Sequence, residues 1–314
     1  MHHPSLTRMA FLATVPALGI ATALPARSQA ATLRVGATAN DTYAEAYYAQ
    51  DMGFFTRAGM TVEITTFPNG AAVSSAVAAG AIDVGISNPV QLGNAVSHGI
   101  PFVFFAGAGL YNTAAPTTVL CVSKDAAIRA PRDFAGQTIA VSALKDITDL
   151  GRIVYLGKNG VDPATVKTIE LPFAEMGPAL SRGTIAGAVI SEPSLSAGIG
   201  AGQTRVFAKV FDAIGPRFLI SGWFTTKDWY AKNTALAKRY AGVIYQTAAW
   251  ANGNHEQSAQ ILAKYSKISA ETAHQMARAT YAGGLDPQLI DPMLQLAQKA
   301  KITDGLVTAS SMIV

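Results

Sequence analysis

The chain has 314 residues, of which 50% are hydrophobic and only 14% are charged, and its formal net charge at pH 7 is +4. This length allows one large domain or two of ordinary size, and the apolar content excludes an intrinsically disordered chain. The small positive charge is dispersed, so no nucleic-acid-binding face is expected. A single cysteine, Cys121, excludes an intramolecular disulfide framework and a thiolate zinc site.

Residues 1–30 have the pattern of a secretory signal peptide. A weakly basic start precedes an apolar stretch over 9–24, and the segment ends in Ser-Gln-Ala. Signal peptidase accepts only small side chains at these last positions, so we expect cleavage after Ala30. A membrane anchor is the alternative, but Pro16 and Pro25 interrupt a run that is already short for a span. The sequence has no cysteine near the cleavage site to which a lipid anchor could be attached. We therefore expect an exported, soluble protein.

The rest of the chain alternates predicted strands and helices. In the first half, strands and helices are expected in turn over 32–36, 43–51, 60–66, 71–79, 83–87, 89–98 and 102–106. A second series is expected over 117–123, 137–141, 147–158, 168–171, 174–181 and 186–191, followed by an apolar run at 218–226 and a helix-rich tail over 227–300. Strands alternating with helices of about ten residues imply parallel βαβ crossovers, so the predicted fold class is α/β.

Two segments of the chain match each other. Residues 80–89 and 183–193 each contain a helix-ending glycine, an apolar strand and a closing Ile-Ser-x-Pro. This match favours two lobes of similar architecture. The alternative is coincidence, because the sequence helix, glycine, strand and turn is common in α/β proteins.

Motifs for catalysis are absent from the sequence. There is no nucleophile elbow, phosphate-binding loop, Gly-x-Gly-x-x-Gly after a strand or His-Glu-x-x-His. His98, His255 and His274 are scattered, and Cys121 lies in an apolar strand pattern typical of a small core residue. We therefore predict no catalytic residue, no metal site and no cofactor.

Polar residues gather where the predicted strands end, which is where open α/β sheets bind ligands. Twelve candidate binding residues come from these positions: Thr38, Asn40, Asp41, Tyr43, Asn69, Gly70, Ser87, Asn88, Ser142, Lys145, Ser191 and Glu192. Each alone is equally explained as a turn or a helix cap, and only their joint appearance favours a site. Trp223 is a thirteenth candidate, interpreted either as a stacking wall for a flat ligand or as core packing.

Several stretches resemble one known family. Residues 49–55 read AQDMGFF, 58–63 read AGMTVE, 78–85 read AAGAIDVG and 134–141 read FAGQTIAV. Together with Glu192-Pro193 and the Ser-Gly-Trp that ends at Trp223, they resemble the periplasmic solute-binding proteins of the NMT1/THI5-like group, which includes the SsuA/TauA-type sulfonate binders. The resemblance extends over nearly the whole chain after residue 30. It is specific to the family and not to a ligand.

This resemblance implies a type II periplasmic-binding-protein fold, with two lobes of mixed or parallel sheets and a hinge of two crossing segments. Lobe I is expected over 31–120 and 222–314, and lobe II over 121–221. The family also implies a periplasmic monomer that captures a small molecule between its lobes and passes it to the permease of an ABC transporter. It implies no enzymatic activity.

The ligand itself stays open. Sulfonate or nitrate would use helix N-termini and the hydroxyls of Thr38, Ser87 and Ser142, although Asp41 and Glu192 would repel an anion if both face the cleft. A pyrimidine, carried by other family members, would instead suit Glu192 beside an aromatic wall from Tyr43 or Trp223, and an aromatic acid is a further alternative. We favour a small organic ligand with a flat or apolar part.

Two other functions are compatible with the sequence. A periplasmic adaptor could bind the same ligand and hand it to a receptor. Fungal enzymes of the group make the thiamine pyrimidine with a cysteine-rich motif, and the single cysteine and the predicted export signal argue against that activity.

Overall fold

The structure is a computed structural model that describes residues 1–2 and 32–314. Residues 32–314 belong to one compact unit. Apart from its first two residues, the predicted signal peptide lies outside the described residues. Within the part of the chain that is described, no helix combines the length and the apolar character needed to cross a membrane.

Five strands form the first sheet, in the order β2 (Val62–Thr66), β1 (Leu33–Ala37), β3 (Val84–Ser87), β12 (Gly222–Thr226) and β4 (Phe102–Gly107). β1 is parallel to β2 and β3, as the alternation of strands and helices predicts. β12 is antiparallel to both of its neighbours, β3 and β4, and it comes from a distant part of the chain. The sheet is therefore mixed.

The second sheet repeats this arrangement with five strands, in the order β8 (Lys167–Glu170), β7 (Thr138–Val141), β9 (Gly187–Ser191), β6 (Thr118–Ser123) and β10 (Thr204–Ala208). β7 is parallel to β8 and β9, whereas β6 is antiparallel to β9 and β10. β3 and β9 thus occupy equivalent positions, and they are the strands of the two matching sequence segments. The match therefore reflects the same architecture used twice.

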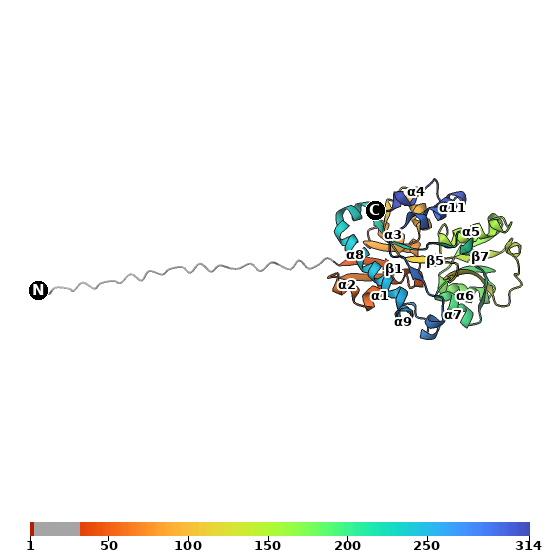
Figure 1. Ribbon diagram of the computed structural model, residues 1–314, viewed down its shortest axis with the longest axis horizontal. Coiled ribbons are helices and arrows are strands. Elements are labelled where there is room, and N and C mark those ends of the chain that lie inside the picture. Colours follow the sequence, from red (N-terminus) through yellow and green to blue (C-terminus); the bar gives the residue numbers. More distant parts are fainter. Residues whose placement is uncertain (3–31) are drawn as a thin grey trace. The chain divides into compact units, whose positions relative to one another are not determined.

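A small third sheet lies between the labels of β1 and β7 in Figure 1, in the order β11 (Arg217–Leu219), β5 (Gly109–Asn112) and β13 (Thr280–Tyr281). β5 leads from the first sheet into β6, and β11 leads back into β12. The two segments that connect the large sheets are therefore antiparallel neighbours.

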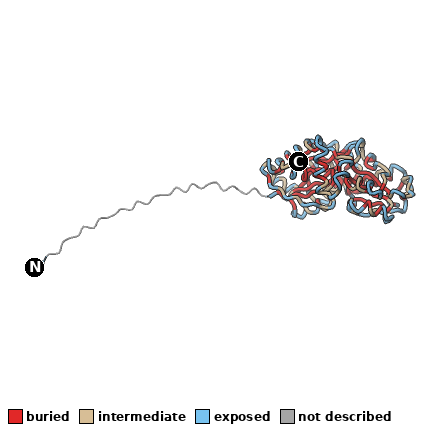
Figure 2. The backbone as a smooth tube through the Cα atoms, turned by 90° about the horizontal axis from the view of Figure 1, so that it is seen from below, coloured by how far each residue is buried: buried red, intermediate tan, exposed pale blue. Residues whose placement is uncertain are grey.

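Helices cover the sheets, and buried residues line the interior of the fold (Figure 2). The helices in the first part of the chain are α1 (Glu45–Asp51), α2 (Phe54–Arg57), α3 (Gly70–Ala78) and α4 (Pro89–Ser97). Those that accompany the second sheet are α5 (Ile147–Lys158), α6 (Phe173–Ser181) and α7 (Ser194–Gly200). The tail contains α8 (Lys227–Gly253), α9 (His255–Ser266), α10 (Ala270–Gln275), α11 (Asp291–Lys299) and α12 (Ala309–Met312).

Local sequence explains where several of these helices begin and end. The side chains of Asn69, Asn88 and Asp146 cap the N-termini of α3, α4 and α5 by accepting hydrogen bonds from backbone N–H groups of the first turn. Gly80 and Gly183, the predicted helix-ending glycines, adopt left-handed φ angles of 68° and 71° just after α3 and α6.

The structure differs from the sequence prediction mainly in the strands that join the two sheets. The single apolar run at 218–226 is divided into β11 and β12, because the chain leaves one sheet and enters another within it. β5, β10 and β13 were not predicted. β13 has only two residues, too few for an alternating pattern to show.

Candidate ligand-binding cleft

A small cavity, called here the inner chamber, lies where strands of both large sheets end. Thr38 follows β1 and Gly70 begins α3 on the side of the first sheet, while Ser142 follows β7 and Ser191 ends β9 on the side of the second. Its volume of about 20 Å³ suits roughly one water molecule. The complete lining is Thr38, Asn40, Thr42, Tyr43, Asn69, Gly70, Thr118, Ser142, Asp146, Ile147, Thr148, Phe173, Ser191, Phe211 and Ile220.

A second, larger cavity of about 630 Å³, called here the outer cavity, shares Thr38, Asn40 and Phe173 with the inner chamber. Its other lining residues are largely apolar and include Phe67 and Pro172. Because the two cavities share lining residues, they are neighbouring parts of one cleft.

Direct hydrogen bonds bridge the two sides of this cleft. The Asn69 side-chain amide, at the start of α3, donates to the Ser142 carbonyl oxygen at 2.8 Å. The Asp41 backbone N–H donates to the Glu192 carbonyl oxygen at 3.2 Å. Elements of both large sheets therefore touch on two edges of the inner chamber, and the structure is a closed arrangement.

Gly70 allows a close approach inside the first half of the cleft. A Cβ atom at this position would lie 2.7 Å from the Ser87 hydroxyl oxygen and 3.3 Å from the Ser87 Cα atom. The Ser87 hydroxyl donates to the Gly70 carbonyl oxygen at 3.1 Å. Glycine at the start of α3 thus permits the helix to contact the end of β3 directly.

Asp146 is the charged side chain of the inner chamber, and it is also the N-cap of α5. Its carboxylate accepts hydrogen bonds from the Ser142 hydroxyl at 2.5 Å and from the Thr148 hydroxyl at 2.6 Å. It also accepts from the backbone N–H groups of Thr148 at 2.8 Å and Asp149 at 3.1 Å. Burial raises the pKa of Asp146 to about 6, and these hydrogen bonds oppose the rise.

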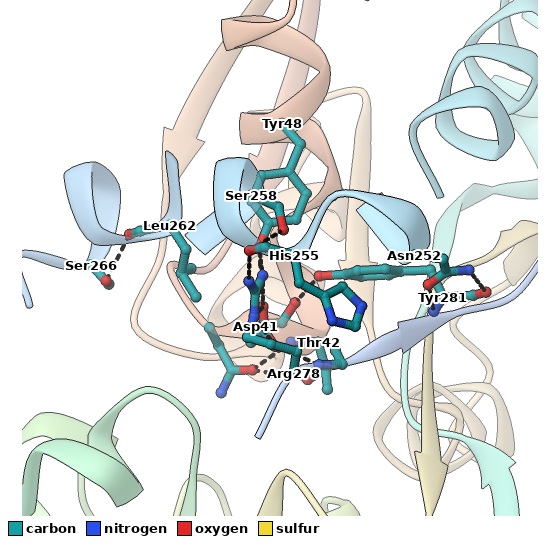
Figure 3. A network of polar contacts seen from close by, with 12 residues as sticks. Asp41, Thr42, Tyr48, Asn252, His255, Ser258, Leu262, Ser266, Arg278 and Tyr281 are labelled. Atoms are coloured by element: carbon teal, nitrogen blue, oxygen red, sulfur yellow. Dashed lines mark hydrogen bonds and ion pairs between the residues drawn. The ribbon is translucent and has the colours of Figure 1, made fainter. Parts of the chain in front are cut away.

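Asp41 is buried and does not line either cavity. Arg278, from the C-terminal part of the chain, donates to it from Nη2 at 3.0 Å and from Nε at 3.2 Å (Figure 3). The Tyr48 hydroxyl donates at 3.0 Å, the Ala279 N–H donates at 2.6 Å, and the Tyr281 hydroxyl donates to the Asp41 carbonyl oxygen. This network anchors the loop that carries Asn40 and Thr42 to the segment around β13.

The other charged candidates also lie outside both cavities. The Glu192 carboxylate is buried and accepts from the Ser196 N–H at 3.0 Å and the Ser196 hydroxyl at 2.8 Å. Burial raises the pKa of Glu192 to about 7, and the nearby Asp41 charge adds to the rise. Lys145 is exposed in a left-handed turn before α5, with φ of 60°.

Trp223 is fully buried and belongs to the core, so the core-packing interpretation describes it. Its indole N–H donates to the Glu45 carboxylate at 2.8 Å, and its ring meets the Tyr240 ring edge-on at 5.1 Å between centroids. Cys121 is likewise buried in β6. Burial raises the pKa of its thiol to about 12, as expected for a core residue.

The inner chamber therefore brings together about half of the residues chosen from the sequence: Thr38, Asn40, Tyr43, Asn69, Gly70, Ser142 and Ser191. It does not include Asp41, Ser87, Asn88, Lys145, Glu192 or Trp223. Sequence reasoning missed the other eight lining residues, among them Asp146, Thr148, Phe173 and Phe211. Phe173 begins α6 directly after a strand, a position that could have been read like the other strand ends. Among the described residues, no cluster of three or more His, Cys, Asp or Glu could hold a metal ion.

Comparison with solved structures defines the class of fold. The chain is similar to the alkanesulfonate-binding protein SsuA from Xanthomonas axonopodis pv. citri bound to MOPS, with a TM-score of 0.76, 18% identity and coverage of 90% of this chain and 98% of that one. It is also similar to the periplasmic nitrate-binding protein NrtA from Synechocystis PCC 6803, with a TM-score of 0.75, 16% identity and coverage of 88% and 83%. The fold is that of the periplasmic binding proteins.

The chain belongs to the NMT1/THI5-like family, because the model of that family matches residues 40–258. This confirms the resemblance seen in the sequence. A curated relative, the taurine-binding periplasmic protein of Escherichia coli (strain K12), is 27% identical over 192 residues. That match covers 61% of this chain and 58% of the relative, so the chain spans less than two thirds of the relative's length.

Proposed function

We propose that the protein captures a small organic ligand in the cleft and delivers it to the permease of an ABC importer. The observation that carries this proposal is the inner chamber, whose walls come from equivalent strand ends of two similar sheets. Hydrogen bonds such as Asn69 to Ser142 join the two walls. A site built from two halves can bind ligand when open and enclose it when closed.

Relatives support this function. The matched proteins are named for binding taurine, alkanesulfonate and nitrate, and none of these names describes an enzyme. We therefore infer that this chain binds its ligand without converting it.

The lobe boundaries, the hinge, the export signal and the oligomeric state form part of the same proposal. Lobe I comprises residues 31–120 and 222–314, lobe II comprises residues 121–221, and the neighbouring strands β5 and β11 lie next to the hinge. Residues 1–30 direct export, and the protein acts as a periplasmic monomer. Seven of the thirteen residues chosen from the sequence, Asn40 among them, face the ligand in the inner chamber, and buried neighbours such as Asp41 support them.

A thermal-shift screen of the purified protein tests the proposal. Sulfonates, nitrate, pyrimidines and aromatic acids are added in turn, and titration calorimetry follows for each compound that raises the melting temperature. A compound that binds only the folded state stabilises it by mass action, by about 2.7 kcal/mol at one hundred times its dissociation constant. Failure of every class to bind, or turnover of a bound compound, would overturn the proposal.

Two matched variants test whether the ligand binds in the cleft. Asn40→Ala removes an inner-chamber amide whose Oδ1 accepts from the N–H two residues later. Asn112→Ala removes an exposed asparagine that makes the same local hydrogen bond outside either cavity. Binding should weaken in Asn40→Ala alone.

A further inference from the structure

The hydroxyl groups of the inner chamber have little donor capacity left, because each has one proton and most of these protons are already donated within the protein. The Ser142 and Thr148 hydroxyls donate to the Asp146 carboxylate, at 2.5 and 2.6 Å. The Thr42 hydroxyl donates to Asn40 Oδ1 at 2.8 Å. Each of these acceptors is an oxygen without a proton, so the direction of donation is fixed.

The same holds on the side of the second sheet. The Ser191 hydroxyl donates to the Thr117 carbonyl oxygen at 3.2 Å, and the Thr118 hydroxyl therefore donates to the Ser191 hydroxyl at 2.9 Å. Five of the seven hydroxyls that line the chamber thus have only lone pairs left for a ligand. The chamber hydroxyls as a group therefore accept hydrogen bonds more than they donate them.

The charged residues around the inner chamber also favour a ligand that donates hydrogen bonds. No lysine or arginine is among the described residues that line the inner chamber, whereas the Asp146 carboxylate is. The α5 N-terminus, which could otherwise attract an anion, is capped by that carboxylate, whereas the α3 N-terminus is capped by the neutral Asn69 amide. The cationic lining residue of the outer cavity is Lys267. A sulfonate or nitrate in the inner chamber would face lone pairs and a carboxylate, without a cation to balance its charge.

Some donor capacity remains. The orientation of the Asn40 amide is fixed because Oδ1 accepts from the Thr42 N–H at 3.0 Å, and no hydrogen bond within the described chain uses its Nδ2 group. The Thr38 and Tyr43 hydroxyls and the Gly70 backbone N–H at the start of α3 likewise make no hydrogen bond within the described chain. A ligand can therefore place one acceptor here beside its donors, as a neutral amide does.

We propose, building on the proposed function, that the ligand places one nitrogen atom with two or more N–H donors in the inner chamber, which admits a group about the size of a water molecule. This nitrogen belongs to a neutral amide or to a cationic amidine or ammonium, and not to a sulfonate or nitrate ligand. The outer cavity, with Phe67, Pro172 and Phe173 in its lining, holds the flat or apolar remainder of the molecule. The ligand class therefore differs from the sulfonates and nitrate for which the structural relatives are named.

Three probes that share one ring test this assignment: benzamidine, benzamide and benzenesulfonate. Titration calorimetry at pH 7 should show binding of benzamidine or benzamide, and binding of benzenesulfonate at least tenfold weaker. Tighter binding of benzenesulfonate would overturn the ligand class while leaving the capture of a solute intact. If none of these probes binds and every class of the thermal-shift screen fails as well, both the ligand class and the proposed function are refuted.

Asp146→Asn tests the cause of the preference. Asparagine still caps α5, but its amide donates to the Ser142 hydroxyl and releases that hydroxyl's proton toward the chamber. We expect affinity for benzamidine to fall by about tenfold and affinity for benzenesulfonate to rise, since a charge-assisted hydrogen bond is lost.

Asp162→Asn is the matched control, because Asp162 caps a short helix in the same way away from both cavities. It should leave the preference unchanged, and circular dichroism checks that both variants fold. An unchanged preference in a folded Asp146→Asn protein would overturn the role of the carboxylate.

Discussion

Replacing Arg278 by methionine should destabilise the protein strongly. The substitution keeps an apolar stem of similar length and removes the guanidinium that faces Asp41. The Asp41 carboxylate is 0% exposed and the Arg278 side chain is 8% exposed, so water cannot replace the lost partner. Tyr48 and Ala279 continue to donate, but neither carries a positive charge.

The expected loss follows from this burial. Removing one partner of a buried ion pair typically costs about 3–5 kcal/mol, because an uncompensated charge remains inside the protein. We expect Arg278→Met to lower the free energy of unfolding by an amount in this range. The double variant Asp41→Asn/Arg278→Met should recover part of the loss, because it buries a neutral amide instead of a carboxylate.

Urea denaturation at pH 7 measures these differences through the midpoint and the slope of the transition. Lys264→Met is the control, because it also breaks an ion pair, with Asp51, but Lys264 is largely exposed and its loss should be barely resolved. If Arg278→Met were no more destabilising than Lys264→Met, the buried network would not hold the Asp41 loop. Ligand binding should also weaken in Arg278→Met, since Asn40 next to Asp41 lines the chamber.

Two further predictions concern the edges of the cleft. Burial raises the pKa of Glu192 to about 7 from an ordinary value of 4.5, so the folded protein binds the proton more tightly and wild-type stability should fall as pH rises between these values. Glu192→Gln lacks this fall, so its stability relative to wild type should increase by about 3 kcal/mol over that pH range in urea titrations, and a constant difference would contradict the assignment. Gly70→Ala should cost about 1–3 kcal/mol because its Cβ would lie 2.7 Å from the Ser87 hydroxyl, whereas a Cβ at Gly200 meets no atom within 4 Å. Equal stability of Gly70→Ala and Gly200→Ala in the same urea assay would show that the contact at α3 is not tight.

The sequence predicts most of the elements because they depend on local patterns. Strands β3 and β9 are buried throughout, each is apolar up to a final serine, and each is preceded by a glycine with a left-handed φ angle, so both their position and their equivalence are visible in the chain. The antiparallel strands β6 and β12 are different. They read as ordinary apolar runs, and their direction depends on the path by which the chain crosses between sheets, which no local pattern encodes.

The cleft is predicted less completely for the same reason. Thr38 and Ser142 can be found because they follow strands whose carboxyl ends must lie at one edge of a sheet. Arg278 could not be found, because it lies in a loop without a motif and acts on a residue more than 200 positions earlier. The sequence allowed Trp223 to be either a stacking wall for a ligand or a core residue. Its burial and its indole hydrogen bond to Glu45, which no local pattern reveals, identify it as a core residue.

Charge in the sequence proved a poor guide to which residues line the cavities, and the reason is physical. A carboxylate near a closed cleft loses its water and needs partners, so Asp41 is neutralised by Arg278 and Glu192 is held by Ser196. Such residues become supports for the cleft walls. The inner chamber is instead lined mainly by hydroxyl and amide groups beside the Asp146 carboxylate, and whether a hydroxyl donates or accepts is set by the neighbour that already holds its proton, as Asp146 does for Ser142. Under the proposed function, the choice of ligand therefore depends on the hydrogen-bond partners of the lining residues, which a list of polar residues cannot reveal.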